Sequence, residues 1–475
     1  MSTMPERTIE ETVEALRDEL VGAAREVWGL AEVGLKETKS AQLLMELCRR
    51  HGFTVEAGVA GMPTAFVASS GSGHPIIALL GEYDALPGLS QKAQPVKEPL
   101  EPGRPGHGCG HNLLGVGAFG AAVALKAALD RHGLPGTVRF YGCPAEETLV
   151  GKVFMVRDGL FDDVDAAITW HPGSTNTLWA GSALAMNSAK FTFHGRSSHA
   201  AGDPQSGRSA LDAVELMNVG ANYLREHIVQ EARLHYVITK GGGEPNIVPP
   251  IAEVWYYVRA PKRKQVEEIF ERLRKVADGA ATMTETTYEM EFLTGCYNTL
   301  HNEAIGDAMY ERLRQVGPPA FDAEDEAFAR AMVNGYPSGL LADTYEWYRE
   351  RGQDLNGKVL HDGVMPQLDK GKVSAGSTDV GDVSYVTPTA QLTTACAPLG
   401  APGHSWQVTA ASGMSIGFKG MIVAAKVMAL TALDLMTKPD LLARAREEFL
   451  AKTKDSPYVS PLPPGLKPPL HQLDH

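Results

Sequence analysis

Residues 75–84 read Pro-Ile-Ile-Ala-Leu-Leu-Gly-Glu-Tyr-Asp, a short apolar run that ends in glycine and acidic residues. A bounded apolar run of this length is typical of a buried strand. Residues 137–141 and 165–170 have the same form, and residues 113–132 between them are rich in alanine and leucine and predict a long helix. Strands that alternate with helices predict an α/β fold, with helices on both faces of one sheet.

The middle of the chain has a different pattern, which predicts a second and smaller domain. Strand and helix patterns follow one another there in the order β-α-β-β-α-β, which is the ferredoxin-like split motif. We therefore expect residues 185–297 to be an α+β insertion, with residues 1–184 and 298–475 forming the main domain. The expected elements are Lys190–His194, Arg208–His227 with Ser206 or Ser209 as cap, His235–Lys240, Ala252–Arg259, Pro261–Ala280 and Thr287–Phe292.

Composition and charge narrow the class of protein. The chain has 44 basic and 57 acidic residues and a formal net charge of −13, so nucleic acid and anionic membranes are unfavourable partners. Its five cysteines are odd in number and scattered, which argues against a disulfide framework and favours the cytoplasm. Residues 1–21 predict an amphipathic helix capped at Thr8, not a secretory signal. The apolar residues 415–435 include three charges and predict a buried helix within 412–435, not a membrane span.

One short motif concentrates metal-binding side chains. Residues 107–112 read His-Gly-Cys-Gly-His-Asn, and the two glycines allow the backbone to curl tightly around an ion. A thiolate from Cys109 and a neutral imidazole from His111 suit an ion of the zinc or manganese class. Glu146 and Glu147 follow the predicted strand 137–141, and His171 follows strand 165–170.

The positions of these residues favour a shared site. Ligands in open α/β sheets bind at the carboxyl ends of the strands, where His171, His404 and the acidic pair are expected. Taken singly, a cysteine, a histidine or a Glu-Glu pair is more often structural, but the combination predicts a metal site. Adjacent residues on an extended segment point in opposite directions, so one carboxylate of the pair can hold a metal while the other faces a water. Such a carboxylate can take the proton of that water and pass it to a leaving nitrogen, which is a plan for amide hydrolysis.

The motifs at residues 81–87, 107–112 and 144–147 resemble the aminoacylase/glutamate carboxypeptidase family of metallo-amidohydrolases. Further matches, which extend the resemblance over nearly the whole chain, lie at residues 193–200, 241–249, 382–384 and 402–405. Within the family, the spacer 112–115 and the run 377–384 resemble the branch that hydrolyses p-aminobenzoyl-glutamate. The resemblance implies a di-metal α/β catalytic domain with an inserted ferredoxin-like lid and dimerisation domain.

The resemblance also implies roles for individual residues. Glu146 takes the place of the general base, and Asp84 that of the carboxylate that orients a ligating histidine. His199 matches a histidine that reaches across a dimer interface to polarise the scissile carbonyl. Asn246 and Arg259 match residues that hold the substrate; a surface position on a strand is the alternative for Arg259. The implied ligands of two divalent ions, zinc or manganese, are Cys109, His111, Glu147, His171 and His404.

Two positions depart from the aminoacylase pattern and fit the cysteine branch of the family, and a third departs from that cysteine branch. Glu82 stands where that pattern has a histidine, Cys109 stands where it has a bridging aspartate, and Asn112 stands where an aspartate is common. The roles of Asp379 and Asp382 are left open between support of the site and loop capping.

The expected function is metal-dependent hydrolysis of the amide of a small N-acyl amino acid, with p-aminobenzoyl-glutamate, cleaved to p-aminobenzoate and glutamate, as the leading substrate. The alternatives are a dipeptidase, a hydrolase of other aryl- or indole-acyl conjugates, and, from another class, a non-catalytic ligand-binding or regulatory subunit. The expected assembly is a homodimer, and a second-subunit partner is left open.

Overall fold

The structure is a computed structural model that describes residues 3–470. Its larger part is built on a seven-stranded sheet in which β3, β4, β5 and β11 are parallel, while β1, β2 and β6 are antiparallel to their neighbours. This confirms the α/β class. In spatial order the strands are β1 (Thr54–Ala57), β2 (Phe66–Ser72), β4 (Gly136–Cys143), β3 (Ile76–Glu82), β5 (Ala166–Gly173), β11 (Thr389–Ala395) and β6 (Thr177–Trp179).

The central strand β3 is buried on both faces, which explains its continuous apolar run. Ile77 and Leu79 face one core, which includes helices α4 (His111–His132) and α13 (Ser415–Thr437). Ile76, Ala78 and Leu80 face the opposite core, which includes α5 (Gly151–Arg157). The remaining helices around this sheet are α1 (Met4–Ala15), α2 (Arg17–Leu30), α3 (Thr38–Arg50), η1 (Val59–Gly61), α8 (Glu303–Val316), α9 (Ala323–Val333), α10 (Leu340–Arg349), α11 (Val380–Ser384), α12 (Trp406–Ser412) and α14 (Pro439–Thr453).

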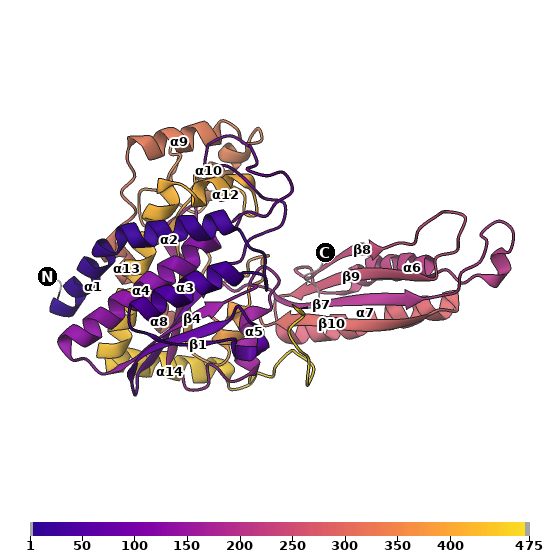
Figure 1. Cartoon of the computed structure of the whole chain (residues 1–475), viewed down its shortest axis with the longest axis horizontal. Coiled ribbons are helices and arrows are strands. Elements are labelled where there is room, and N and C mark those ends of the chain that lie inside the picture. The colour runs from indigo at the N-terminus through magenta and orange to yellow at the C-terminus, as the bar shows by residue number, and fades with distance from the viewer. Residues whose placement is uncertain (1–2, 471–475) are drawn as a thin grey trace.

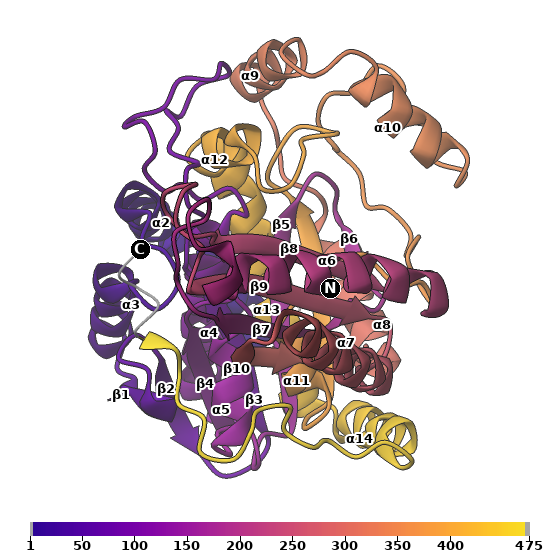
Figure 2. The same ribbon diagram turned by 90° about the vertical axis from the view of Figure 1, so that its right-hand side faces the viewer.

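A second sheet of four strands lies to one side of the larger part and gives the molecule its elongated shape (Figure 1); in Figure 2 this sheet lies in front of the larger part. Its spatial order β10-β7-β9-β8 and its sequence order β-α-β-β-α-β are those of the expected ferredoxin-like motif. Helices α6 and α7 share a separate apolar core with this sheet. The elements are β7 (Ala185–His194), η2 (Pro204–Ser206), α6 (Ala210–Leu224), η3 (Arg225–His227), β8 (Arg233–Lys240), β9 (Ile251–Ala260), α7 (Arg263–Thr284) and β10 (Thr287–Cys296).

Two details of the expected helices are wrong. The first helix is capped by Thr3, whose hydroxyl accepts the backbone N–H of Glu6, and Thr8 lies inside the helix, where its hydroxyl donates to the carbonyl of Met4. The helix predicted over residues 412–435 begins three residues later, at Ser415 of α13, because Ser412 is the last residue of the separate short helix α12. A side chain at Gly413 would collide with the ring of Trp28, so glycine allows close packing at this break.

Two helices, α4 and α13, are long and apolar enough to cross a membrane by length and composition. In each, more than four-fifths of the most apolar window is buried inside the protein: 89% in α4 and 83% in α13. This burial is typical of core helices, as expected for residues 415–435.

Candidate metal centre

The candidate site lies at the carboxyl edge of four neighbouring parallel strands. Glu82 is the last residue of β3, Glu146 and Glu147 follow β4, His171 lies near the end of β5, and His404 follows β11. Because β4, β3, β5 and β11 are adjacent in the sheet, these ends meet at one edge. The motif at residues 107–112 joins them, since His111 begins α4 directly after Gly110, whose φ is 80°.

The predicted ligands come together in overlapping groups. The potential ligand atoms of Cys109, His111 and His171 lie within 4.8 Å of one another, and so do those of Cys109, Glu147 and His404. The Cys109 Sγ and His171 Nε2 atoms are 3.3 Å apart, and the His404 Nε2 and Glu147 Oε2 atoms are 3.4 Å apart. Cys109 therefore lies between two sets of donors. A third group of the same compactness consists of Glu82, His111 and Glu146.

Two histidine rings are held with one nitrogen turned toward the site. Asp84 Oδ1 lies 2.8 Å from His111 Nδ1, and Asp84 Oδ2 accepts the backbone N–H of Glu147 at 2.9 Å. His171 Nδ1 lies 2.8 Å from the carbonyl of Pro172. A bond at Nδ1 leaves Nε2 as the donor atom for an ion, which is the usual arrangement around ligating histidines. Asp84 thus lies within hydrogen-bonding distance of the His111 ring.

Among the described residues, two candidate ligand atoms at this edge are buried without a hydrogen-bond partner, His111 Nε2 and Glu147 Oε1, and His107 Nδ1 and Asn112 Oδ1 of the same motif also lack one. Buried polar atoms are rarely left without a partner, because the loss of hydration is costly. A thiolate, imidazoles and a carboxylate are also the donor types preferred by zinc and by other ions of its class. The donor set and its two unpartnered atoms therefore fit divalent metal ions.

Burial disfavours the ionised forms of three acidic groups in the cluster, Cys109, Glu146 and Glu147. Burial raises the pKa of the Cys109 thiol to about 12 and that of Glu147 to about 7. Burial, followed by the charge of Glu82, raises the pKa of Glu146 well above its usual value. Burial lowers the pKa of His171 to about 4, so this ring is neutral and able to coordinate a metal. Added positive charge would hold the acidic groups in their ionised forms.

The sequence reasoning missed Lys152, which lies one turn after the acidic pair on α5. Its side chain is fully buried, and its Nζ lies 2.7 Å from Glu82 Oε1 and 2.5 Å from Asp379 Oδ1. Glu82 Oε2 in turn lies 3.4 Å from His111 Nε2. Lys152 is the only lysine buried in the described part of the chain. A charged residue in the apolar stretch 149–156 was the available signal, since a buried lysine requires acidic partners.

The turn that carries the acidic pair is supported from behind by residues that are not ligands. Ala145 has a φ of 54°, a left-handed conformation that is unusual for a residue with a side chain. Its N–H donates to the buried Glu37 Oε1 at 2.7 Å. A side chain at Gly34 would meet the Cα of Ala145 at 3.0 Å, so the loop after α2 presses directly on this turn.

Three predicted residues belong to the smaller part of the molecule, and only one of them, Arg259, is near the cluster. Arg259 is at the end of β9 next to the larger part. Burial, then the charge of His111 and then the charge of Arg259 lower the pKa of His404, so Arg259 lies near this ring. Its Nε is buried without a partner. His199 and Asn246 lie in loops at the opposite end, where the N–H of Ala200 donates to the carbonyl of Asn246. A ten-residue strand spans about 33 Å, so within one chain His199 is far from the cluster.

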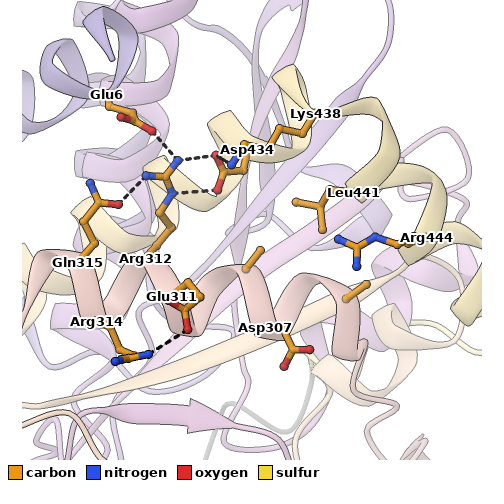
Figure 3. A pocket seen from close by; sticks show the side chains of 12 residues that line it. Glu6, Asp307, Glu311, Arg312, Arg314, Gln315, Asp434, Lys438, Leu441 and Arg444 are labelled. Carbon is orange, nitrogen blue, oxygen red and sulfur yellow. Dashed lines mark hydrogen bonds and ion pairs between the residues drawn. The ribbon is translucent and has the colours of Figure 1, made fainter. Parts of the chain in front are cut away.

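A cavity of about 850 Å³ opens beside the cluster, between the two sheets. It reaches from Glu147 and the loop at Leu86 and Pro87 to Lys190 and Trp255. Another cavity, of about 760 Å³, lies among α1, α8, α13 and α14 around Arg312 and contains none of the predicted site residues (Figure 3). The position of the first cavity makes it the candidate substrate site.

A family model, related sequences and a solved structure all relate this chain to the same family of peptidases. The family model of peptidase family M20/M25/M40 matches residues 78–346. A subunit of the p-aminobenzoyl-glutamate hydrolase of Escherichia coli is 44% identical over 97% of this chain and 98% of its own, and the Xaa-Arg dipeptidase of Mus musculus is 29% identical over 96% and 94%. The fold resembles that of a Bacillus subtilis protein described as a dinuclear metal-binding peptidase from the M20 family, with a TM-score of 0.55, 18% identity and coverage of 89% of this chain and 99% of that one.

Proposed function

The chain belongs to peptidase family M20/M25/M40, and on that premise we propose that it hydrolyses the amide bond of an N-acyl amino acid with the help of divalent metal ions. The leading substrate is p-aminobenzoyl-glutamate, cleaved to p-aminobenzoate and glutamate, because the 44% identical relative carries that substrate in its name. The observation that carries the proposal is the convergence of five potential ligands, with His111 Nε2 and Glu147 Oε1 buried and unpartnered.

Two divalent ions are the cofactors we propose, either zinc or manganese. Cys109, His111, Glu147, His171 and His404 would hold them, with Cys109 common to both groups of donors. Thiolate and imidazole favour zinc, whereas carboxylates also suit manganese. When bound, such ions polarise the scissile carbonyl and acidify water.

The proton transfers are assigned to Glu146. Its carboxylate is buried at the edge of the cluster, with Oε2 3.8 Å from His111 Nε2. It accepts a proton from the attacking water as the C–O bond forms, and it delivers that proton to the amide nitrogen as the C–N bond breaks. Asp84 and Lys152 act through their neighbours: Asp84 orients His111 and the backbone of Glu147, and Lys152 fixes Glu82.

Substrate binding and carbonyl polarisation are assigned to Arg259, Asn246 and His199. The guanidinium of Arg259, whose Nε is buried without a hydrogen-bond partner, suits the free carboxylate of the amino acid product. Because His199 and Asn246 lie at the far end of their own sheet, we propose that the partner's His199 completes each site in a homodimer. An imidazole aimed at the developing oxyanion is worth about 3 kcal/mol for a single donor.

The four-stranded sheet offers a surface for such a dimer, and we assign residues 185–297 to a lid and dimerisation domain inserted between residues 1–184 and 298–475. Strand β8 is an edge strand, and Tyr236, Val237 and Ile238 on it are 38–53% exposed. The adjacent α6 exposes Val219 and Tyr223. Exposed apolar residues on an edge strand are typical of a pairing surface.

Mixing two inactive variants tests the shared site. Glu146→Gln and His199→Ala remove residues that a mixed dimer would supply from different chains. After exchange of subunits, about a quarter of the wild-type activity should return, because half of the dimers are mixed and each contains one complete site. No recovery, in a mixture shown to form mixed dimers, would contradict a shared site.

A cytoplasmic location is consistent with five cysteines that form no disulfide in the structure. The relative from Escherichia coli is named as one subunit of its hydrolase, which supports a second-subunit partner in addition to the homodimer. Activity of the purified chain alone, compared with activity after addition of such a partner, distinguishes a required partner from a modulating one.

The function is tested with protein reconstituted with zinc or with manganese and assayed against p-aminobenzoyl-glutamate, an indole-acyl aspartate and a set of dipeptides. We expect chelator-sensitive release of p-aminobenzoate. Preference for a dipeptide would favour the dipeptidase alternative, which the 29% identical relative supports. Absence of hydrolysis with every substrate and either metal would favour a non-catalytic ligand-binding or regulatory role.

A further inference from the structure

The open face of strand β9 carries a row of aromatic and cationic side chains. Residues of β9 alternate, and Ala252, Val254, Tyr256, Val258 and Ala260 are fully buried against the helices of their sheet. The intervening residues Trp255, Tyr257 and Arg259 must therefore share the opposite face. We call these three residues, together with Lys190 of the neighbouring strand β7, the aromatic row.

Contacts within the aromatic row hold its members in order. The rings of Trp255 and Tyr257 lie 5.6 Å apart at 77°, and the guanidinium of Arg259 lies 5.5 Å from the Tyr257 ring. The Lys190 ammonium lies 5.6 Å from the other end of the row, at the Trp255 ring. Trp255 Nε1 also donates to Ser188 Oγ at 2.8 Å, which fixes the indole. The row is thus ordered before any ligand arrives.

Two members of the aromatic row, Trp255 and Lys190, line the candidate substrate cavity. Trp255, Lys190 and Ser188 line the cavity of about 850 Å³ that also contains Glu147. Trp255 and Tyr257 line an adjoining cavity of about 260 Å³. Apolar residues, including Leu86, Pro87 and Val237, form other parts of the larger cavity wall. A planar apolar group held here would lie between Glu147 of the cluster and the Trp255 ring, with the Tyr257 ring behind it in the adjoining cavity.

Resting on the function proposed above, we infer that Trp255 and Tyr257 are the residues that select an aromatic acyl group, so that the substrate class is N-aroyl amino acids. Arg259 at one end of the row binds the carboxylate of the amino acid, while the two rings pack against the aryl group. Aromatic packing of this kind prefers offset or edge-to-face geometry and adds to the burial of apolar surface. Lys190 and Ser188 are positioning residues, since they act on the Trp255 ring.

The test compares two substrates that share one amino acid, p-aminobenzoyl-glutamate and acetyl-glutamate. Trp255→Leu should lower kcat/KM for the aroyl substrate about tenfold, mainly through KM, and should change kcat/KM for the acetyl substrate less than about twofold. Tyr257→Leu should act in the same direction, and Tyr257→Phe should retain the aroyl preference because the ring remains. Trp347→Leu on α10, where the indole is exposed and remote from the cavity, is the matched control.

A binding measurement separates this inference from the proposed function. Calorimetry with the Glu146→Gln protein should give a Kd for p-aminobenzoyl-glutamate that rises about tenfold when Trp255→Leu is added. Equal losses for aroyl and acetyl substrates, or an unchanged Kd, would overturn the inference while leaving the hydrolase intact. A wild-type protein that binds the aroyl ligand through Trp255 but hydrolyses nothing would instead contradict the proposed function.

Discussion

Two groups of buried charged residues lie in the larger part of the molecule, one around Arg312 and one around His111. Arg312 donates to both oxygens of Asp434, at 2.5 and 2.8 Å, and to Gln315 and Glu6, each at 2.6 Å (Figure 3). Each nitrogen of its guanidinium has an acceptor. Around His111, by contrast, the candidate ligand atoms His111 Nε2 and Glu147 Oε1 are buried without a hydrogen bond to any described residue.

The acids in the two groups also differ in how they are balanced. Near His111 the buried acidic side chains outnumber the basic ones, with Lys152 as the fixed cation; these acids are Glu82, Asp84, Glu146, Glu147 and Asp379. Both groups border cavities of comparable size, about 760 and 850 Å³. Cavity size therefore does not distinguish the functional site from a structural ion-pair cluster, whereas unpartnered donors and uncompensated charge do.

Removal of metal should have the largest effect, and it should change the group around His111 without changing the group around Arg312. Dialysis against a chelator should reduce hydrolysis to background, because the donors around His111 lose the ions that we propose they hold. Zinc or manganese should restore activity, as measured by assay and elemental analysis. The ion pairs of Arg312 should be unaffected, so the helical content measured by circular dichroism should persist. Full activity in protein shown to be metal-free would contradict the metal dependence.

Lys152→Met should have the next largest effect, through stability. It leaves Glu82 and Asp379 buried without their cation, and breaking a buried ion pair in this way costs about 3–5 kcal/mol. Denaturant unfolding measures the loss. Adding Asp379→Asn to Lys152→Met should recover part of it, because one uncompensated charge is removed. A double variant no more stable than Lys152→Met would argue against charge compensation.

Glu146→Gln should lower the rate of catalysis while leaving the fold and the metal content unchanged. We expect kcat to fall at least about 100-fold, which corresponds to about 2.7 kcal/mol of activation free energy. The reason is that the side-chain amide of glutamine cannot accept the proton of the attacking water. Metal content should stay the same, since Glu146 is not among the proposed ligands. Glu56→Gln, an exposed exchange of the same kind on β1, is the control. Near-normal turnover of Glu146→Gln would rule out Glu146 as the base.

Arg312→Met should give the smallest effect of the four. Asp434 keeps the ammonium of Lys438 at 2.8 Å, and the side chain of Glu6 is partly accessible to water at 13%. The expected loss of unfolding free energy is therefore about 1–3 kcal/mol, with unchanged kcat per folded molecule. A fall in kcat in fully folded protein would show that the two groups are coupled.

Much of the metal-ligand cluster is predictable because its residues follow strands. The ends of parallel strands must meet at one edge, so the strand pattern brings Glu147 and His171 to the same edge once β4 and β5 lie on either side of β3. Lys152 is different, because its partner Asp379 is 227 residues away and neither belongs to a metal-binding motif. Pairing over that distance depends on how α11 packs against α5, which a local pattern does not encode.

The four-stranded sheet gives a similar lesson. Its order of elements follows from alternation and spacing, and the structure has that order. The position of His199 relative to the cluster does not follow from alternation and spacing. It depends on the length of the strands and on which end of β7 faces the larger part. The cap of the first helix was assigned to Thr8 instead of Thr3 because several residues near the start of the chain satisfy a capping pattern.

The contact of Glu37 and Gly34 with the turn at Ala145 has a consequence for how the protein tolerates truncation. Neither residue is a proposed ligand, yet together they fix the left-handed backbone from which Glu146 and Glu147 project. A chain shortened to begin after α3 would keep all five proposed ligands and the base. It would nevertheless lose the contacts of Gly34 and Glu37 that support the turn before Glu146 and Glu147. We therefore expect the segment that includes α2 and α3 to be as necessary for catalysis as the family motifs.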